Sequence, residues 1–447
     1  MQPLKTYIYP SYGVANLGKV AVEVTLQLYL FDFYTRILGL SPLLAGAAFA
    51  VAIFWDAVSD IVISAGLFKA RQRGIAYSTV LLLGSVVLAV STVALFSPLN
   101  AGSDLYLFFH LLITYVLLNT GMTLLDLPHT SLSAELSRKA NERNKLLAAR
   151  LGFGIFGLAL GSALPGIFLA TLSDPSSEAA LKASRSQSAW VLAICVLVTA
   201  ALTTYFIRKQ EKSTQPNTPD QIPGIKEVKA LFEDTPFVKI LIAGVVAAIG
   251  RTINAALALM YYRFVLKLSE TSITQIVLPV FTLSIVLSIP LWIYLSKSMG
   301  KQKPAYLAIS GLGLMGIIAY PLLPEGLVWP VIIISIIGGI LSSSVFLIDS
   351  MITDIIDQDE VVTGQRKESL YFAVWKSGQK VARALAFVGV GIGLELVGLD
   401  MSLETVSKSV EWGIILLFGI VVGLCFIVGA YYLYTAKIPA PVENNNT

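Results

Sequence analysis

Two carboxylates occur one helical turn apart in an otherwise apolar part of the sequence. Asp56 and Asp60 belong to the run Trp-Asp-Ala-Val-Ser-Asp, in which Ser59 directly precedes the second acid. A spacing of four residues puts both carboxylates on the same face of a helix. Carboxylates this close repel each other unless a proton or a cation lies between them. Because oxygen ligands suit hard cations, the pair predicts a site for Na⁺ or for a proton.

Basic side chains recur at helical spacing much later in the chain. Lys376, Lys380 and Arg383 follow one another at intervals of four and three residues, so a helix would align them in one stripe. This stripe can balance Asp56 and Asp60, and Lys380 is the expected partner of the two acids when no cation is bound. The remaining positive charges would attract an anionic group or point toward the membrane surfaces.

A third set of charges combines residues that are distant in the sequence. Lys19 and Glu23 lie one turn apart and can pair with each other, whereas Asp126 and Arg150 belong to two successive apolar stretches. An Asp–Arg couple across two helices can bind the hydroxyl groups of a polar substrate, or it can lock the helices together. The residues alone leave both interpretations open.

These charges lie in a chain that is too apolar to be an ordinary soluble protein. Of its 447 residues, 55% are hydrophobic and 13% are charged, whereas soluble domains carry about 25% charged residues. A net charge of +4 is too small to predict a nucleic-acid partner, and two Cys residues cannot form a disulfide framework. The composition predicts an all-α polytopic membrane protein.

Twelve apolar stretches reach the length of roughly 20 residues that a helix needs to cross a bilayer. They are expected at 12–35, 43–68, 75–97, 104–127, 147–172, 188–208, 236–262, 273–296, 304–323, 329–350, 369–396 and 410–434. The longest polar break, at 209–235, predicts a cytoplasmic linker between a six-helix bundle over 1–208 and a second one over 236–447. A short surface helix is expected near 225–232.

The distribution of basic residues predicts the orientation of these spans. With both termini in the cytoplasm, 19 Lys and Arg residues lie in inside segments and 6 lie outside, which favours this arrangement in a plasma (inner) membrane. Seven remain inside the spans: Lys19, Arg150, Lys239, Arg251, Lys376, Lys380 and Arg383. A charge at mid-bilayer costs roughly 2.5–3.5 kcal/mol. Most of these residues are therefore expected to line an internal polar cavity, although Lys239 is near enough to a helix end to reach the surface.

The sequence offers no support for an enzyme. Two matches to the dinucleotide-binding pattern GxGxxG, at 152–157 and 311–316, fall inside apolar spans and predict close helix packing instead. His110 and His129 have no neighbouring ligands at metal-site spacing, and His129 is expected to have at most a minor role in lining the cavity. We therefore expect no cofactor beyond a coupling ion.

Four segments resemble a known family of transporters. They are Gly-Lys at 18–19 with the run at 34–41, Trp-Asp-Ala-Val-Ser-Asp at 55–60, Asp-Leu-Pro-His-Thr-Ser-Leu at 126–132, and 354–357 continuing through 363–369 to Gln-Lys at 379–380. Together, over about 12–399, they are similar to the glycoside–pentoside–hexuronide:cation symporters. That family is a branch of the major facilitator superfamily, and the sodium-linked lysophosphatidylcholine symporters are its relatives.

The resemblance implies a coupling-cation site. Asp56 and Asp60 match the acidic pair of that site, Ser59 occupies the position of a polar neighbour, and Thr123 matches a hydroxyl from the fourth membrane helix. Lys380 matches the lysine that faces the acids from the eleventh helix. Na⁺ or H⁺ would be the ion bound.

The resemblance also implies a sugar pocket, to which Lys19, Asp126 and Arg150 correspond. Two positions depart from the melibiose carriers of the family: Val20 replaces an acid and Thr130 replaces a tryptophan. These changes remove a carboxylate that binds hydroxyls and a ring on which a sugar could stack. We therefore do not expect galactoside transport, and the surplus of basic residues favours an anionic or amphiphilic substrate.

These observations predict a symporter, coupled to Na⁺ or H⁺, that moves a sugar-like or sugar-acid molecule by alternating access. The predicted substrate-binding residues are Lys19, Glu23, Asp126, Arg150, Lys376 and Arg383. The expected partners are this small molecule and membrane lipid, with the protein acting as a monomer. A lysophospholipid or other lipid transporter on the same fold, and a non-transporting receptor, are the alternatives. Export instead of import also remains open.

Overall fold

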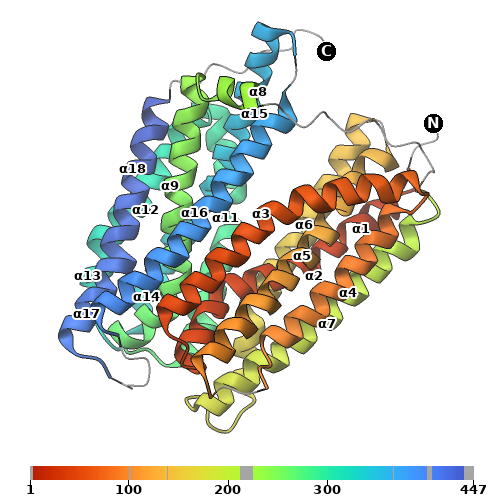
Figure 1. Cartoon of the computed structure of the whole chain (residues 1–447). Helices are drawn as coiled ribbons and strands as arrows, with labels where there is room; N and C mark the ends of the chain where they lie inside the picture. Colours follow the sequence, from red (N-terminus) through yellow and green to blue (C-terminus); the bar gives the residue numbers. More distant parts are fainter. Residues whose placement is uncertain are drawn as a thin grey trace. The chain divides into compact units, whose positions relative to one another are not determined.

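The computed structural model describes residues 4–99, 102–137, 139–211, 225–365, 367–399 and 405–436, which are helical with short connections and contain no strand (Figure 1). The chain divides into two compact units. The first comprises Met1–Pro219 and Ser269–Pro279, and the second comprises Asp220–Leu268, Val280–Leu399 and Thr405–Thr447. Residues 212–224 of the predicted linker lie outside the described residues.

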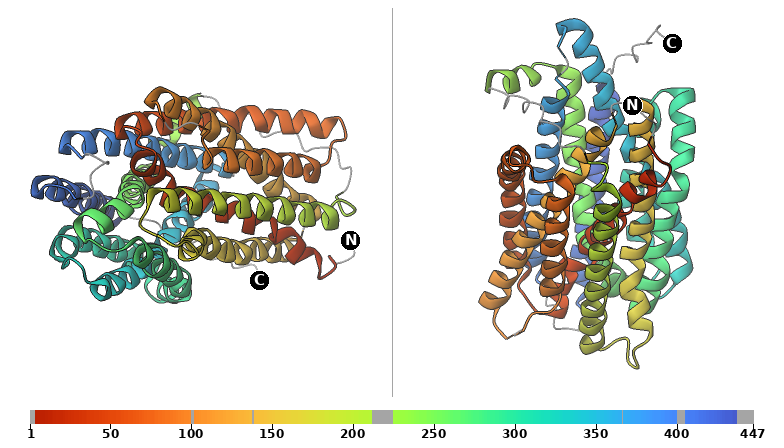
Figure 2. Two further views of the ribbon diagram at one scale, coloured as in Figure 1. Left: turned by 90° about the horizontal axis from the view of Figure 1, so that it is seen from below. Right: turned by 90° about the vertical axis from the view of Figure 1, so that its right-hand side faces the viewer.

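The first unit is a bundle of long helices that run alongside one another (Figure 2). Its first membrane helix is built from α1 (Ile8–Gly13), α2 (Ala15–Thr25) and two π-helical stretches, η1 (Leu26–Leu30) and η2 (Phe33–Ile37). It is followed by α3 (Pro42–Gln72), α4 (Tyr77–Leu95), α5 (Asp104–Leu136), α6 (Ala140–Ala170) and α7 (Glu178–Ile207).

Most of the later helices belong to the second unit. After the short α8 (Ile225–Leu231), where a surface helix is predicted, come α9 (Thr235–Met260) with η3 (Tyr261–Val265), and α10 (Glu270–Ser272) with η4 (Ile273–Val277) and α11 (Leu278–Met299). They are followed by α12 (Gln302–Leu314), η5 (Met315–Ala319), α13 (Tyr320–Leu322), α14 (Val328–Ser342), η6 (Ser343–Val345), α15 (Phe346–Thr363), α16 (Glu368–Val397), α17 (Lys408–Ile415), η7 (Leu416–Val421) and α18 (Val422–Thr435).

Ten helical segments of the described chain are long and apolar enough to cross a membrane, which confirms the prediction of a polytopic all-α protein. Two further predicted spans are helical but fall outside this set. Both carry too many charges: Lys19, Glu23 and Asp32 lie in the first membrane helix, and Lys376, Lys380 and Arg383 lie in α16. A helix can include such charges because its backbone hydrogen bonds do not depend on the polarity of its side chains.

Several helices extend further than predicted. The helix ending with α15 reaches Thr363 instead of residue 350, α5 reaches Leu136 instead of 127, and α7 begins at Glu178 instead of 188. Hydropathy locates only the part of a helix that matches the hydrocarbon thickness. The additional turns are polar and continue the same backbone hydrogen bonding beyond the hydrocarbon region.

Glycines bring the first membrane helix against α6. An added Cβ at Gly157 would collide with the backbone oxygen of Leu17, and one at Gly161 would collide with that of Ala21. The glycine pattern at 152–157 therefore serves close helix packing, as predicted. Lys19 lies between these two positions on α2, and Asn16 of α2 donates to the backbone oxygen of Arg150 on α6.

Candidate functional site

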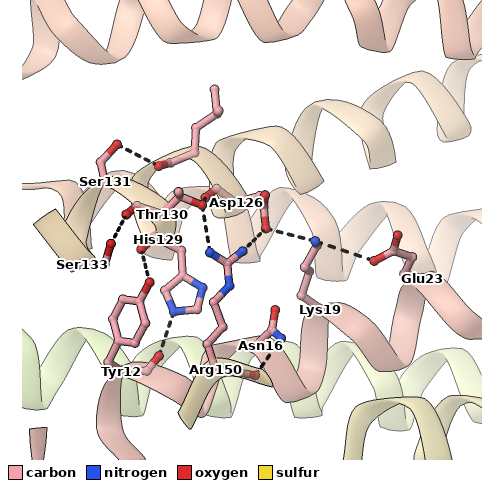
Figure 3. A network of polar contacts seen from close by, with 11 residues as sticks. Tyr12, Asn16, Lys19, Glu23, Asp126, His129, Thr130, Ser131, Ser133 and Arg150 are labelled. Atoms are coloured by element: carbon pink, nitrogen blue, oxygen red, sulfur yellow. Dashed lines mark hydrogen bonds and ion pairs between the residues drawn. The ribbon is translucent and has the colours of Figure 1, made fainter. Parts of the chain in front are cut away.

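Asp126 is the centre of an ion-pair network in the first unit, which Figure 3 shows. Its Oδ1 atom lies 2.6 Å from Nη2 of Arg150 and 3.0 Å from Nζ of Lys19, and Nζ of Lys19 also lies 3.6 Å from Oε2 of Glu23. The residues come from α2, α5 and α6. The structure thus brings together four of the six predicted substrate-binding residues, as two acids and two bases whose charges balance.

The network leaves acceptor atoms available to a ligand. Both cations bind the same oxygen of Asp126, and none of the described residues forms a hydrogen bond with the other oxygen, Oδ2. The side chain of Asp126 is 33% exposed, whereas those of Lys19 and Arg150 are 18% and 15% exposed. A ligand hydroxyl can therefore donate to Asp126 while the two cations hold the carboxylate in place.

Thr130 completes the support of Arg150, a role that the sequence interpretation missed. Its hydroxyl accepts a hydrogen bond from Nη1 of Arg150 at 2.8 Å and donates to the backbone oxygen of Asp126 at 2.9 Å. The guanidinium is thus held at two points, by Thr130 and by Asp126. Asn16 adds a third contact by donating to the backbone oxygen of Arg150 at 2.9 Å. The spacing of Asp126 and Thr130, one turn apart on α5, is the signal that could have indicated this arrangement.

His129 has a structural role instead of the minor lining role expected. The Tyr12 hydroxyl donates to the backbone oxygen of His129 at 2.9 Å, and Nε2 of His129 lies 2.7 Å from the backbone oxygen of Tyr12. Because a carbonyl only accepts, Nε2 carries the proton. The His129 side chain is fully buried. These reciprocal bonds fix α1 against α5 just beyond Pro128, where the proline removes a backbone donor.

The two carboxylates of α3 meet one hydroxyl from α5. Thr123 Oγ1 lies 2.9 Å from Oδ1 of Asp60 and 3.5 Å from Oδ1 of Asp56. Ser59 is buried, and its hydroxyl donates to the backbone oxygen of Asp56 at 3.1 Å. Of the predicted cation ligands, Asp56, Asp60 and Thr123 therefore present side-chain oxygens to one another, while the Ser59 hydroxyl is used within its own helix.

The predicted basic stripe belongs to α16 of the second unit. Next to it, Trp375 Nε1 donates to Oδ1 of Asp349 at 2.9 Å, and Nη2 of Arg251 on α9 donates to Oε1 of Gln379 at 3.4 Å. Lys376 and Arg251 both interact electrostatically with Asp349. The predicted pairing of Lys380 with Asp56 and Asp60 joins residues of different units and stays a prediction.

A second buried charge cluster, not anticipated from the sequence, lies where α3 and α5 end. Arg71 forms an ion pair with Glu135 and lies 3.7 Å from Oε1 of Glu211. Glu211 also accepts hydrogen bonds from the first residues of α4, including one of 2.6 Å from the hydroxyl of Ser78. Burial raises the pKa of Glu135 to about 7, although Arg71 opposes this shift. Among the described residues, two acids share one base here, so these three side chains are together neutral when Glu135 holds a proton.

A third cluster lies at the opposite end of the first unit. Arg36 binds Asp32 through Nε at 2.7 Å and through Nη2 at 2.8 Å, and its Nη2 atom also lies 3.0 Å from Oε1 of Glu270. The guanidinium of Arg185 lies 4.4 Å from the centre of the Tyr29 ring. All four charged side chains are buried. Glu270 belongs to the segment Ser269–Pro279, which the chain contributes to this unit after α9.

Comparison with known proteins agrees with this architecture. The chain is 25% identical to a glucuronide carrier protein homolog of Escherichia coli, over 86% of this chain and 82% of that protein. It is 22% identical to the sodium-dependent lysophosphatidylcholine symporter 1-A of Danio rerio, over 88% of this chain and 77% of that protein. The inward-open xylose transporter XylE of E. coli has the same fold, with a TM-score of 0.66, 15% identity and 98% coverage of both chains.

The family assignment follows from a match over nearly the whole chain. Residues 11–440 match the family described as MFS/sugar transport protein. This match confirms the resemblance to major facilitator symporters that the four sequence segments indicated, and it identifies a transporter and not an enzyme. The chain belongs to the MFS/sugar transport protein family.

Proposed function

We propose that the protein is a cation-coupled symporter that moves a sugar or sugar acid across the membrane by alternating access. The observation that carries the proposal is the meeting of Asp56 and Asp60 with the hydroxyl of Thr123. Two carboxylates one turn apart are stable together only when a cation or a proton reduces their repulsion. Binding the coupling ion between them is the function that this arrangement supports best.

Thr123 couples this ion site to the helix that holds the substrate network. The hydroxyl donates to a carboxylate and keeps oxygen lone pairs, so it can also act as a ligand for Na⁺. Asp126 follows Thr123 on α5 by less than one turn. Loading of the ion would fix this part of α5 and release Lys380 from the acids. Ion and substrate would then raise each other's affinity by the same factor.

The network around Asp126 supports recognition of hydroxyl groups. A sugar hydroxyl can donate to Oδ2 of Asp126 and accept from Lys19 or Arg150, and these residues are held by short contacts across three helices. Glu23 is the most exposed of the four charged residues, at 41%. It provides a further acceptor at the edge of the network. A glucuronide carrier homolog among the relatives supports a sugar acid as the substrate class.

A lysophospholipid is the second candidate substrate. It is favoured by the similarity to a sodium-dependent lysophosphatidylcholine symporter over 88% of this chain. Such a substrate would require a path for its acyl chain, so labelled lysolipid transported in a sodium-dependent manner would support it. A non-transporting receptor would bind the same molecules without any flux.

We further propose that the protein acts as a monomer in the plasma (inner) membrane with both termini in the cytoplasm. The 19 to 6 division of basic residues supports this orientation. Import is the direction expected when the ion runs down its gradient into the cell. Labelling of single cysteines placed at the two termini of the chain would test the orientation.

Two substitutions test the coupling site. We expect Asp56→Asn and Asp60→Asn each to abolish accumulation of substrate driven by a Na⁺ or H⁺ gradient in proteoliposomes, because each removes one charge of the ion site. The transported molecule is first identified by a thermal-shift screen of sugars, sugar acids and lysolipids with and without Na⁺. Asp104→Asn, which removes an acid from the first turn of α5, serves as the control. Wild-type accumulation by both site variants would disprove the coupling.

A further inference from the structure

Arg251 lies in the middle of a membrane span. The span built from α9 and η3 covers Thr235–Val265, so Arg251 is sixteen residues from one end and fourteen from the other. At 1.5 Å per residue, either end is about 21–24 Å away along the helix. Arginine side chains reach the membrane surface only from positions near helix ends. Arg251 therefore keeps its charge at the depth where a charge is most costly.

The surroundings of Arg251 do not neutralise this charge by direct pairing. None of the described carboxylates lies within 4.0 Å of its guanidinium. Asp349 interacts with it only through space, while the Oδ1 atom of Asp349 accepts a hydrogen bond from Trp375. Arg383 lies close enough to repel it. Asp349 is thus the one described acid that acts on Arg251, and it does so without a direct ion pair.

Gln379 directs the guanidinium. Its Oε1 atom accepts from Nη2 of Arg251, and its Nε2 atom is buried near Gly244, where an added Cβ would lie 3.0 Å from it. The amide is thus fixed by the packing of α16 on α9. An arginine has five N–H donors in a rigid fork. With one of them directed to Gln379, the others suit the paired oxygens of an oxyanion.

We propose that Arg251, within the second unit, binds a carboxylate, sulfonate or phosphate group of the transported molecule. The inference rests on the proposed transport function and deepens it. In the first unit, Lys19 and Arg150 are matched by Asp126 and Glu23, so that network suits neutral hydroxyl groups.

The test measures binding to purified full-length protein in detergent, with titrations followed by thermal shift. The probes are methyl β-D-glucuronide, its neutral counterpart methyl β-D-glucoside, a lysophospholipid and inorganic sulfate. We expect at least one anionic probe to bind the wild type more tightly than the neutral glucoside does. Arg251→Gln should weaken that binding by about tenfold or more, as expected for a lost charged hydrogen bond, while the affinity for methyl β-D-glucoside changes less than about twofold. A loss of affinity for methyl β-D-glucuronide would indicate a sugar acid, and a loss of affinity for the lysophospholipid would indicate a lipid headgroup.

Two further variants separate binding from structure. Arg251→Lys keeps the charge and should restore part of the anion affinity, which a purely structural defect would not do. Lys239→Gln removes a base from the same helix, at a side chain whose Nζ only donates to the backbone oxygen of Thr435, and should bind like the wild type. The proposal is overturned if Arg251→Gln binds every anionic probe as the wild type does, or if no anionic probe exceeds the glucoside. Failure of ion coupling in the Asp56 and Asp60 variants would leave this result unaffected.

Discussion

At the scale of single residues, one hydroxyl fixes the orientation of Arg150 in the ion-pair network around Asp126. Thr130 accepts from Nη1 of Arg150 while the neighbouring Nη2 binds Asp126. Thr130→Val keeps the shape of the side chain but removes this acceptor. We expect the KM for transport to rise about tenfold, corresponding to ~1.4 kcal/mol for a hydrogen bond to a charged group, with little change in maximal rate. Concentration-dependent uptake into proteoliposomes measures both constants.

Two controls accompany this variant. Thr130→Ser retains the hydroxyl and should restore the wild-type KM. Thr92→Val removes a buried hydroxyl that bonds only within its own helix, to the backbone oxygen of Leu88, and should not change transport. If Thr130→Val raised the maximal rate of transport or left the KM unchanged, Thr130 would not position Arg150 for binding.

Glu135 gives the folded protein a defined pH dependence. Its pKa is raised from 4.5 to about 7 by burial. Between these values the folded protein keeps a proton that the unfolded chain has released, so the free energy of unfolding falls as the pH rises through this window. Glu135→Gln removes this titrating group. Between about pH 5 and about pH 8, the midpoint of thermal unfolding should therefore fall less in the variant than in the wild type. Glu233→Gln removes an exposed acid and should retain the wild-type slope. An equally steep fall in Glu135→Gln would contradict the assignment.

At the scale of elements, a buried ion pair holds the segment Ser269–Pro279 in the first unit. Glu270 contributes to it through the contact with Arg36. Glu270→Gln removes one of the two acids that bind Arg36, and loss of one member of a buried pair typically costs about 3–5 kcal/mol. We expect a lower unfolding temperature and faster amide exchange within Ser269–Pro279, measured by hydrogen–deuterium exchange. Glu325→Gln interrupts an exposed ion pair with Lys267 and should cost less than about 1 kcal/mol. Unchanged exchange in the segment would show that the ion pair does not hold it.

The membrane helices could be predicted from the sequence because hydropathy is a local property. Stretches such as 43–68 and 75–97 were identified within a few residues of α3 and α4. The one-turn spacing of Asp56 and Asp60 likewise placed both acids on one helical face. Contacts between residues that are distant in the sequence are harder to predict. The Asp126–Arg150 pair was one of two open interpretations, and the roles of Thr130, Glu135 and Glu270 depend on neighbours that only the packing of the helices reveals.

At the scale of the whole molecule, the two units differ in how their charges are distributed. The ion-pair network around Asp126 in the first unit contains equal numbers of acids and bases, whereas Arg251 in the second unit has no described carboxylate within 4.0 Å. Hydrophobic matching to the bilayer constrains only the outer faces of the helices, so it does not determine how charges are distributed in their interior. Because many functions share one fold, the fold assignment alone does not identify the substrate, and such differences between interior residues must be tested directly.

The position of Ser269–Pro279 also determines how this protein can be divided. A cut in the predicted linker at 209–235 would follow the predicted division into two six-helix bundles, but the N-terminal fragment would lack Glu270 and with it one of the two acids that bind Arg36. Arg36 would then lack this partner until the other polypeptide supplied the missing segment. Split versions of the gene should consequently yield stable protein only when both halves are made together, with the second polypeptide completing the fold of the first.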